Sequence, residues 1–123
     1  MVTASDGGIA LPGDGFVHAR FYGTFPRKIA YYARERGLLS VPDAVRSMTS
    51  LPARLLGMRD RGEVREGFAA DLVVFDPLTL RDTATFFEPH QYPDGIAHVL
   101  VGGTFVVENG TLTNALPGRV LAR

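Results

Sequence analysis

Two oppositely charged side chains near the start of the sequence could act on a polar substrate. Asp6 stands in a Ser-Asp-Gly tripeptide directly after residues 2–4, which we expect to form a very short strand. A carboxylate at such a position could accept and return a proton. Arg20 could bind a carboxylate through two parallel hydrogen bonds from its planar guanidinium. By itself, a Ser-Asp-Gly tripeptide is much more often a plain turn than a catalytic site. An arginine such as Arg20 is as often a solvated loop residue as a ligand-binding one.

The three histidines, His18, His90 and His98, are scattered and include no His-x-His pair. A hydrolytic zinc site needs three protein ligands. We therefore predict that the isolated chain binds no metal tightly and hydrolyses nothing. His18 could assist a site or hydrogen-bond the loop, and the structural role is the commoner one for a lone histidine. We assign no chemistry to the other two.

The composition is that of an ordinary soluble globular domain. The chain has 123 residues, of which 46% are apolar and 21% charged, enough for one modest core. Its 13 basic and 13 acidic residues cancel, which argues against a nucleic-acid partner. The absence of cysteine excludes disulfides and is compatible with the cytoplasm, where we expect the protein to act. No segment predicts a membrane span or a signal peptide, so no membrane partner is expected.

A loop followed by helices is predicted for about the first 60 residues. Residues 1–25 are rich in glycine, which indicates a loop. Pro26 suits a helix start, and a first helix is expected to run from there to about residue 36. Ser40 suits the N-cap of a second helix. A third, shorter helix is predicted for residues 50–57.

The remainder of the chain is predicted to be β-rich. The expected strands are residues 71–75, 97–101, 104–108 and 111–113. Gly102-Gly103 and Asn109-Gly110 predict tight hairpin turns, because these residues tolerate positive φ. Residues 77–96 are expected to cross between strands in an extended form. So few short strands make a thin sheet with open edges, which predicts completion by an upstream region or self-association with another copy.

A series of different short sequence motifs extends over nearly the whole chain. They are residues 5–7, 18–27, 48–53, 60–62, 67–77, 92–93, 95–96, 101–103 and 117–119. Together they resemble the N-acyl-D-amino-acid deacylase family of the metal-dependent amidohydrolase superfamily. The Tyr-Gly-Thr-Phe-Pro-Arg run at residues 22–27 is fairly specific to that family. The Ala-Asp-Leu-Val-Val-Phe-Asp run at residues 70–76 is shared by many amidohydrolases.

The resemblance implies a large enzyme with a metal-bearing TIM-type barrel and a small β-sandwich built from both chain termini. We therefore expect an α+β fragment. Residues 1–60 would be the C-terminal end of the barrel, with an active-site loop and two or three helices. Residues 61–123 would be the C-terminal share of the sandwich. The abrupt start of the sequence fits this expectation, with the upstream part of the same enzyme as partner.

The resemblance also implies roles for individual residues. In the family, the aspartate matching Asp6 contacts the metal-bound water, takes a proton as hydroxide attacks the amide carbonyl, and delivers it to the leaving amine. The arginine matching Arg20 binds the carboxylate of an N-acyl-D-amino acid, and His18 is a second substrate-binding candidate. The implied cofactor is zinc, held mostly by upstream residues, with Asp6 as a further contact. Ala19 departs from the proline usual in the family, and the loop after Asp6 lacks the histidines common there.

Two other interpretations stay open at this point. A non-catalytic β-rich binding or assembly module could share the ancestry, but it would have no need for Asp6 or for residues 18–25. Another amidohydrolase, of the hydantoinase or dihydroorotase kind, would share the general fold, because superfamily folds host many substrates. The loop motif argues against this second alternative.

Overall fold

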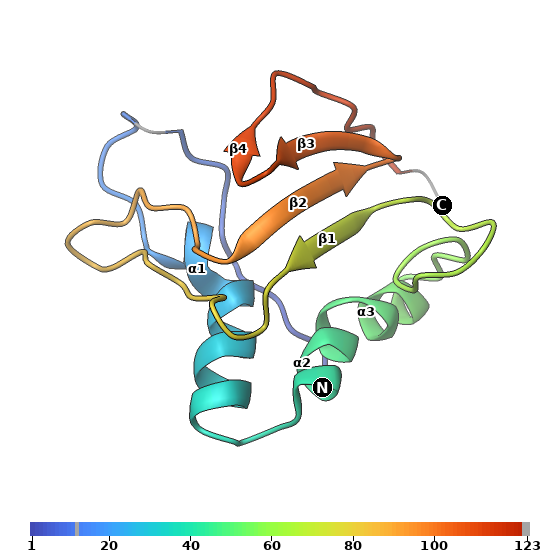
Figure 1. Cartoon of the computed structure of the whole chain (residues 1–123), viewed down its shortest axis with the longest axis horizontal. Helices are drawn as coiled ribbons and strands as arrows, with labels where there is room; N and C mark the ends of the chain where they lie inside the picture. The colour runs from blue at the N-terminus through green and yellow to red at the C-terminus, as the bar shows by residue number, and fades with distance from the viewer. Residues whose placement is uncertain (12, 122–123) are drawn as a thin grey trace.

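Helices come first along the chain and strands second, as the sequence predicts (Figure 1). The computed structural model describes residues 1–11 and 13–121, so the last two residues of the predicted 61–123 region lie outside it. The helices are α1 (Arg20–Arg27), the π-helix η1 (Lys28–Glu35), α2 (Val41–Met48) and α3 (Ser50–Leu55), and the strands are β1 (Leu72–Phe75), β2 (Ile96–Val101), β3 (Thr104–Glu108) and β4 (Thr111–Leu112). The coarse α+β prediction is therefore confirmed.

The first helix begins well before the predicted position. It starts at Arg20, and Pro26 lies inside it rather than at its start. Because proline has no N–H, the carbonyl of Tyr22 loses its usual helical donor. The helix continues because Lys28 N–H donates to the carbonyls of the two residues before Pro26, after which the chain widens into η1. The prediction that Pro26 begins the helix was wrong, because the chain is already helical from Arg20 onward.

The short strand predicted for residues 2–4 does not form. Thr3 N–H instead donates to the carbonyl of Ser47 at 3.0 Å, and the two hydroxyl oxygens also lie 3.0 Å apart. Lys28 donates to the Thr3 hydroxyl as well. A strand needs a neighbouring strand to complete its ladder, and here the neighbours are helices α2 and η1. The segment that leads into Asp6 is therefore anchored on the helical side of the molecule.

The hydrophobic core lies where η1, α2 and the segment after β1 meet. Its buried members are Ile29, Ala33, Ala44 and Leu80. Leu80 is 2% exposed, and the chain returns close beside it at Gly95, where an added Cβ would lie 2.5 Å from the Leu80 nitrogen. The segment between β1 and β2 thus packs on the helices as well as joining two strands.

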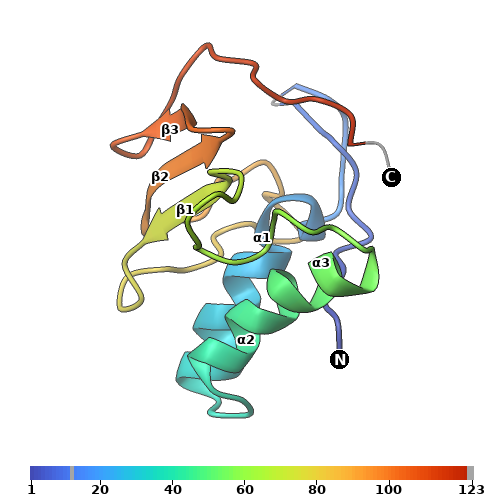
Figure 2. The same ribbon diagram turned by 90° about the vertical axis from the view of Figure 1, so that its right-hand side faces the viewer.

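The sheet is antiparallel with the order β1-β2-β3-β4. Figure 1 shows α2 and α3 below β1, on the side away from β4, and Figure 2 shows the same two helices below the sheet. Positive φ at Gly102 and Gly103 (55° and 82°) and at Asn109 and Gly110 (50° and 74°) confirms the two predicted hairpin turns.

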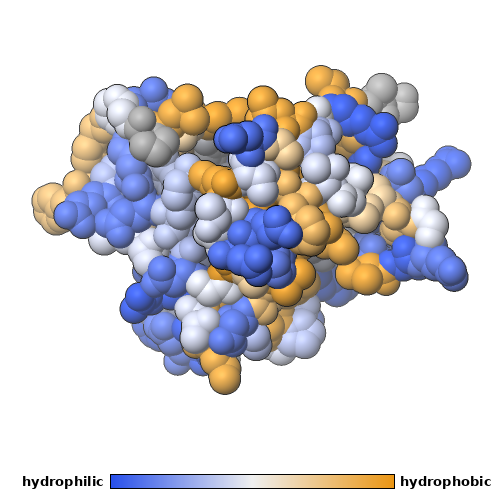
Figure 3. Space-filling model, turned by 45° about the horizontal axis from the view of Figure 1, so that its top comes forward, coloured by the Kyte–Doolittle hydropathy of each residue, from blue (hydrophilic) through white to orange (hydrophobic). Residues whose placement is uncertain are grey.

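Every strand residue is half-buried or exposed. The face turned forward in Figure 3 shows hydrophobic residues interspersed with hydrophilic ones. None of the helices within residues 1–11 and 13–121 has the length and apolar character that a bilayer crossing requires.

Candidate functional site

The structure brings two of the predicted site residues into direct contact. Oδ2 of Asp6 lies 3.0 Å from Nη2 of Arg20. The Asp6 side chain is 89% exposed and that of Arg20 42% exposed. Water screens such a pair, and exposed ion pairs contribute only about 0–1 kcal/mol to stability. Asp6 and Arg20 therefore form a loosely held pair that a small molecule can reach.

A tight turn against the start of α1 holds Asp6 in place. Its φ of 51° is left-handed, a conformation that aspartate tolerates better than most residues. Ser5 Oγ accepts the N–H of Gly7 at 3.1 Å. A Cβ at Gly7 would lie 3.2 Å from Cα of Phe21 and 3.3 Å from the carbonyl oxygen of Arg20. The turn and the helix therefore touch backbone to backbone, which favours glycine at position 7 because an added Cβ would push them apart.

His18 supports the beginning of α1. Its Nδ1 accepts the backbone N–H of Arg20 at 3.0 Å, which satisfies one of the free N–H groups at a helix start. Nδ1 must be unprotonated to accept this bond. The ring also meets Phe86 edge-on, with ring centroids 5.2 Å apart. His18 thus positions the backbone of Arg20, and its substrate-binding role stays a prediction.

A hydrogen-bonded cluster fixes the loop that follows Asp6. The hydroxyl of Tyr22 donates to the carbonyl of Ala10 at 3.1 Å and lies 3.0 Å from Nδ1 of His90. Nε2 of His90 lies 3.0 Å from the carbonyl oxygen of Gly15. Partial burial raises the pKa of Tyr22 above its ordinary value, so the phenol stays protonated as a donor. The loop is therefore tied by two of its carbonyls to this cluster.

Arg27, the last residue of α1, ties the helix to the segment after β1. Its Nη1 donates to Oδ2 of Asp82 at 3.0 Å, and this bond raises the pKa of Arg27. The guanidinium also lies 4.5 Å from the ring centroid of Tyr31. A Cβ at Gly23 would lie 3.1 Å from Cβ of Asp82. The family-specific motif therefore fastens α1 to its neighbours at several points.

The described residues do not make a zinc site by themselves. A protein zinc site uses three or four protein ligands. Residues 1–11 and 13–121 contain no group of three or more His, Asp or Glu side chains placed to hold a metal ion. Asp6 contacts an arginine, and His18 is engaged by a backbone N–H. Zinc bound beside Asp6 would have to take most of its ligands from other residues.

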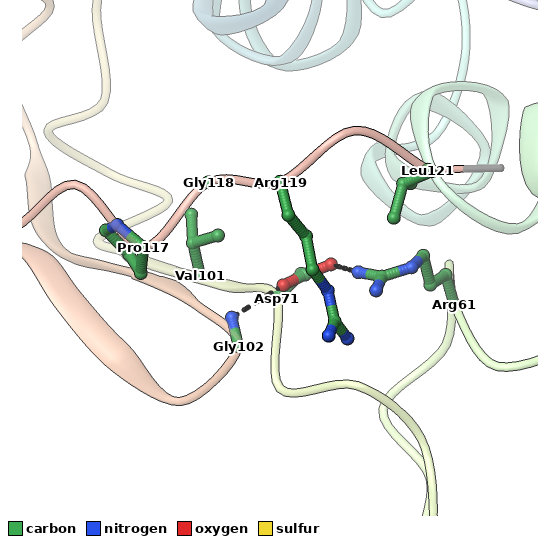
Figure 4. A pocket seen from close by; sticks show the side chains of 8 residues that line it. All are labelled: Arg61, Asp71, Val101, Gly102, Pro117, Gly118, Arg119 and Leu121. Atoms are coloured by element: carbon green, nitrogen blue, oxygen red, sulfur yellow. Dashed lines mark hydrogen bonds and ion pairs between the residues drawn. The ribbon is translucent and has the colours of Figure 1, made fainter.

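A hollow of about 510 Å³ lies elsewhere on the surface, and it contains neither Asp6 nor Arg20 (Figure 4). The carboxylate of Asp71 binds Arg61 and accepts the N–H of Gly102 at 2.8 Å. These contacts join the segment before β1 to the turn between β2 and β3. The hollow is therefore built around a structural ion pair.

Sequence analysis expected Tyr22, Phe25 and Arg27 to pack or pin the loop, but it missed the positioning roles of Gly7 and His90. A glycine after Asp6 does indicate a tight turn, but not that its backbone touches a helix. The Tyr22–His90 contact spans 68 positions, so no local spacing rule could have found it. The family-specific motif that contains Tyr22 was the one available signal.

Comparison with known proteins supports the resemblance. A family profile described as the amidohydrolase family matches residues 2–107. The D-aminoacylase of Alcaligenes xylosoxydans xylosoxydans is 46% identical over 122 residues, which are 99% of this chain and 25% of that protein. The N-acyl-D-glutamate deacylase of the same organism is 43% identical over 122 residues, 99% of this chain and 24% of that protein. The chain thus spans about a quarter of the length of the curated relatives it matches.

Solved structures agree with this. The crystal structure of a D-aminoacylase superposes with a TM-score of 0.91 and 45% identity, covering 99% of this chain and 25% of that one. An N-acyl-D-glutamate deacylase from Bordetella bronchiseptica, complexed with zinc and a phosphonate inhibitor, superposes with a TM-score of 0.78 and 46% identity, covering 85% of this chain and 22% of that one. The resemblance predicted from the motifs is confirmed.

Proposed function

Because the chain belongs to the amidohydrolase family, we propose that it is the C-terminal part of a metal-dependent hydrolase. This hydrolase cleaves the amide bond of N-acyl-D-amino acids, giving a carboxylate and a D-amino acid. The supporting observation is the contact between Asp6 and Arg20, whose charged atoms lie 3.0 Å apart. The matched D-aminoacylase and N-acyl-D-glutamate deacylase add the substrate class.

The contact suits this substrate for a geometric reason. In an N-acyl α-amino acid, the carboxylate and the amide nitrogen are bonded to the same carbon. A group that binds the carboxylate and a group that protonates the nitrogen must therefore be close neighbours. Arg20 and Asp6 are such neighbours, and both are exposed enough to reach a ligand.

Each residue has a distinct task in the proposed reaction. Arg20 holds the substrate carboxylate with two parallel hydrogen bonds. Asp6 accepts a proton from the attacking water as the water oxygen bonds to the acyl carbon. It then gives this proton to the amide nitrogen as the C–N bond breaks. His18 keeps the first turn of α1, and so the backbone of Arg20, in position.

Zinc is the proposed cofactor of the whole protein, as in the zinc-complexed deacylase that this chain resembles. The described residues do not fit a complete zinc site. Most ligands would therefore come from the upstream part of the same enzyme, and we propose that the isolated chain is inactive. The residues of this chain contribute positioning and proton transfer.

The proposal includes a division of the chain. Residues 1–60 would supply the end of a TIM-type barrel, and residues 61–123 the C-terminal share of a β-sandwich. Support comes from the match to only a quarter of each relative and from the absence of a buried residue in β1–β4. A cytoplasmic location stays part of the proposal.

We also propose that the isolated chain self-associates through its sheet edges. Val73 and Leu112, in the two edge strands, are 56% and 59% exposed. Open edges with apolar side chains favour pairing between copies. Light scattering should show dimers or larger species at micromolar concentration, and a monodisperse monomer would contradict this part of the proposal.

The function is tested by a paired assay with zinc supplied. The 123-residue chain and a longer polypeptide from the same reading frame are each given N-acetyl-D-methionine and its L-isomer. We expect activity on the D-isomer in the longer polypeptide alone. Asp6→Ala should lower its kcat by about 100- to 10,000-fold. Asp94→Asn, which removes the carboxylate of an exposed pair with Arg81, is the matched control and should leave kcat unchanged.

Two outcomes of this assay would contradict the proposal. No hydrolysis of either isomer by the longer polypeptide would contradict the proposed substrate class. If the isolated 123-residue chain hydrolysed the substrate, this would contradict the proposal that the remaining site residues lie upstream.

A further inference from the structure

We infer that Lys28 and Ser47 are positioning residues of the proposed site. With the hydroxyl of Thr3 between them, they form a one-way chain of hydrogen bonds. This chain fixes the backbone that leads into Asp6. The inference rests on the proposed function, in which Asp6 carries the proton, and it gives the three other residues no contact with substrate or metal.

Each hydrogen bond in this chain has only one possible direction. The ammonium of Lys28 donates to Oγ1 of Thr3. Oγ of Ser47 donates to the carbonyl of Ala44 at 2.6 Å, and it lies 3.0 Å from Oγ1 of Thr3. An ammonium only donates, a carbonyl only accepts, and a hydroxyl has one proton to give. The Thr3 hydroxyl must therefore accept from Lys28 and donate to Ser47.

The chain of bonds selects one register of the N-terminal segment against the helices. Ser47 is the one buried polar side chain in residues 1–11 and 13–121, and it is 6% exposed. A buried hydroxyl that loses its partner is costly, and a fully paired polar network specifies a single arrangement. A shift of the segment by one residue would place Val2 or Ala4 against Ser47, and neither has a hydroxyl. Additional chain can only bury Ser47 further, so the selection also holds in a longer polypeptide.

Lys28 suits this place better than an arginine would. The 13 basic residues of the sequence include only one lysine. None of the ion pairs within the part of the chain that the structure describes includes it, so its ammonium is directed to the Thr3 hydroxyl rather than to a carboxylate. An ammonium is a compact donor on a flexible stem, whereas a guanidinium is a planar fork that matches carboxylates. We therefore expect Lys28→Arg to break the chain of bonds although it keeps the charge.

The anchor lies close to the residue that it positions. Thr3 stands three residues before Asp6, and its N–H also donates to the carbonyl of Ser47 at 3.0 Å. On the other side of Asp6, Gly7 packs against the backbone of α1. The backbone at Asp6 is thus held from both sides, by η1 and α2 before it and by α1 after it. A misplacement of about 1 Å can lower a rate by about 100-fold, so the loss of one anchor should be visible in kcat.

The first test measures kcat and KM of the longer polypeptide for N-acetyl-D-methionine with zinc supplied. Thr3→Val keeps the shape of the side chain without the hydroxyl, and it should lower kcat by about 10- to 100-fold with KM changed by less than about threefold. Thr3→Ser keeps the hydroxyl and should keep kcat within about threefold of the wild type. Lys28→Met and Lys28→Arg should resemble Thr3→Val. Thr104→Val, at an exposed position of β3, is the matched control and should change neither constant.

Three kinetic results would overturn the inference. One is a wild-type kcat in Thr3→Val or in either Lys28 variant. Another is an equal loss in Thr3→Ser and Thr3→Val, because the hydroxyl would then not be the cause. The third is a loss confined to KM, because a misplaced Asp6 should slow the reaction of bound substrate.

Amide hydrogen exchange in the 123-residue chain decides the inference even if the longer polypeptide hydrolyses neither isomer. The N–H of Thr3 donates to the Ser47 carbonyl, so its exchange, followed by NMR, reports on the anchor. Lys28→Met should speed this exchange by about three- to tenfold, because the anchor loses one hydrogen bond. Thr104→Val should leave the exchange unchanged. If the exchange in Lys28→Met equals that of the wild type, the inference is overturned whatever the kinetic result.

Discussion

The helical part and the sheet part of this chain are held together by different means. In the helical part, Ala44, Ala30 and Leu80 are 0%, 1% and 2% exposed, so packing fixes the elements. In the sheet, every strand residue is half-buried or exposed, and backbone ladders and turns fix the strands. The Asp6–Arg20 pair depends on the helical part, because Arg20 begins α1 and the turn that carries Asp6 packs against that helix.

The largest effect should come from a large-to-small substitution in the packed part. Ile29→Ala removes a side chain that is 6% exposed and should lower the free energy of unfolding by about 2–4 kcal/mol. Val74→Ala, in β1, removes a side chain that is 48% exposed and should cost below about 1 kcal/mol. Urea denaturation measures both. Equal losses would show that the two parts do not differ in the way described.

The second-largest loss of stability should come from a substitution in the segment that joins the sheet to the helices. Gly95→Ala would place Cβ 2.5 Å from the Leu80 nitrogen at a φ of +82°, and backbone atoms cannot move aside easily. We expect a loss of about 2–3 kcal/mol in the same urea experiment. Gly118→Ala is the control, because nothing lies within 4 Å of its added Cβ. A neutral Gly95→Ala would mean that the segment after β1 is not tightly packed on the helices.

The side-chain cap at the start of α2 should contribute less to stability than the packed residues do. Ser40 Oγ accepts the N–H of Asp43 at 3.1 Å at the start of α2. Ser40→Ala should lower stability by about 1 kcal/mol, because one helix N–H loses its partner. Ser50→Ala, in the first turn of α3, should change stability by less than about 0.5 kcal/mol. Thermal unfolding of both variants checks this, and similar losses would argue against a specific capping contribution.

The smallest effect should be a pH dependence at the end of β1. Hydrogen bonds from Leu78 N–H and the Thr79 hydroxyl lower the pKa of Asp76. A lowered folded-state pKa stabilises the protein above the unfolded value of about 4. This contribution is lost as pH falls through the folded-state value. Asp76→Asn should therefore destabilise at pH 6 and lose that difference below about pH 4. A difference that stays constant with pH would contradict this account.

Local patterns in the sequence were enough to predict the strands, both hairpin turns and the Ser40 cap. Each of these depends on residues that are neighbours in the chain. The start of α1 could not be predicted in the same way, because its N-cap residue is Ala19, which has no capping side chain, and the Arg20 N–H donates to His18 Nδ1. Residues 2–4 have strand-forming composition, but their partner in space is Ser47 of a helix.

In the candidate site, too, features that depend on distant parts of the chain could not be predicted. Asp6 and Arg20 were proposed from family motifs, while their contact required the close approach of Gly7 to α1. The Tyr22–His90 cluster depends on a segment far along the chain. Residue types were therefore predictable, and the contacts between them were not.

The π-helix η1 has a consequence for how the sequence can change in length. Its wide turn lets Arg36 N–H reach the carbonyl of Tyr31 at 2.9 Å, five positions earlier. Such a helix holds more residues in a given length than an α-helix does. Its two ends are constrained, by Arg27 on one side and by the buried Ala33 on the other. Relatives that lack one residue between Lys28 and Arg36 should therefore have an ordinary α-helix here, with Arg20 in the same place. The π-helix η1 can thus absorb the insertion of one residue without moving the site.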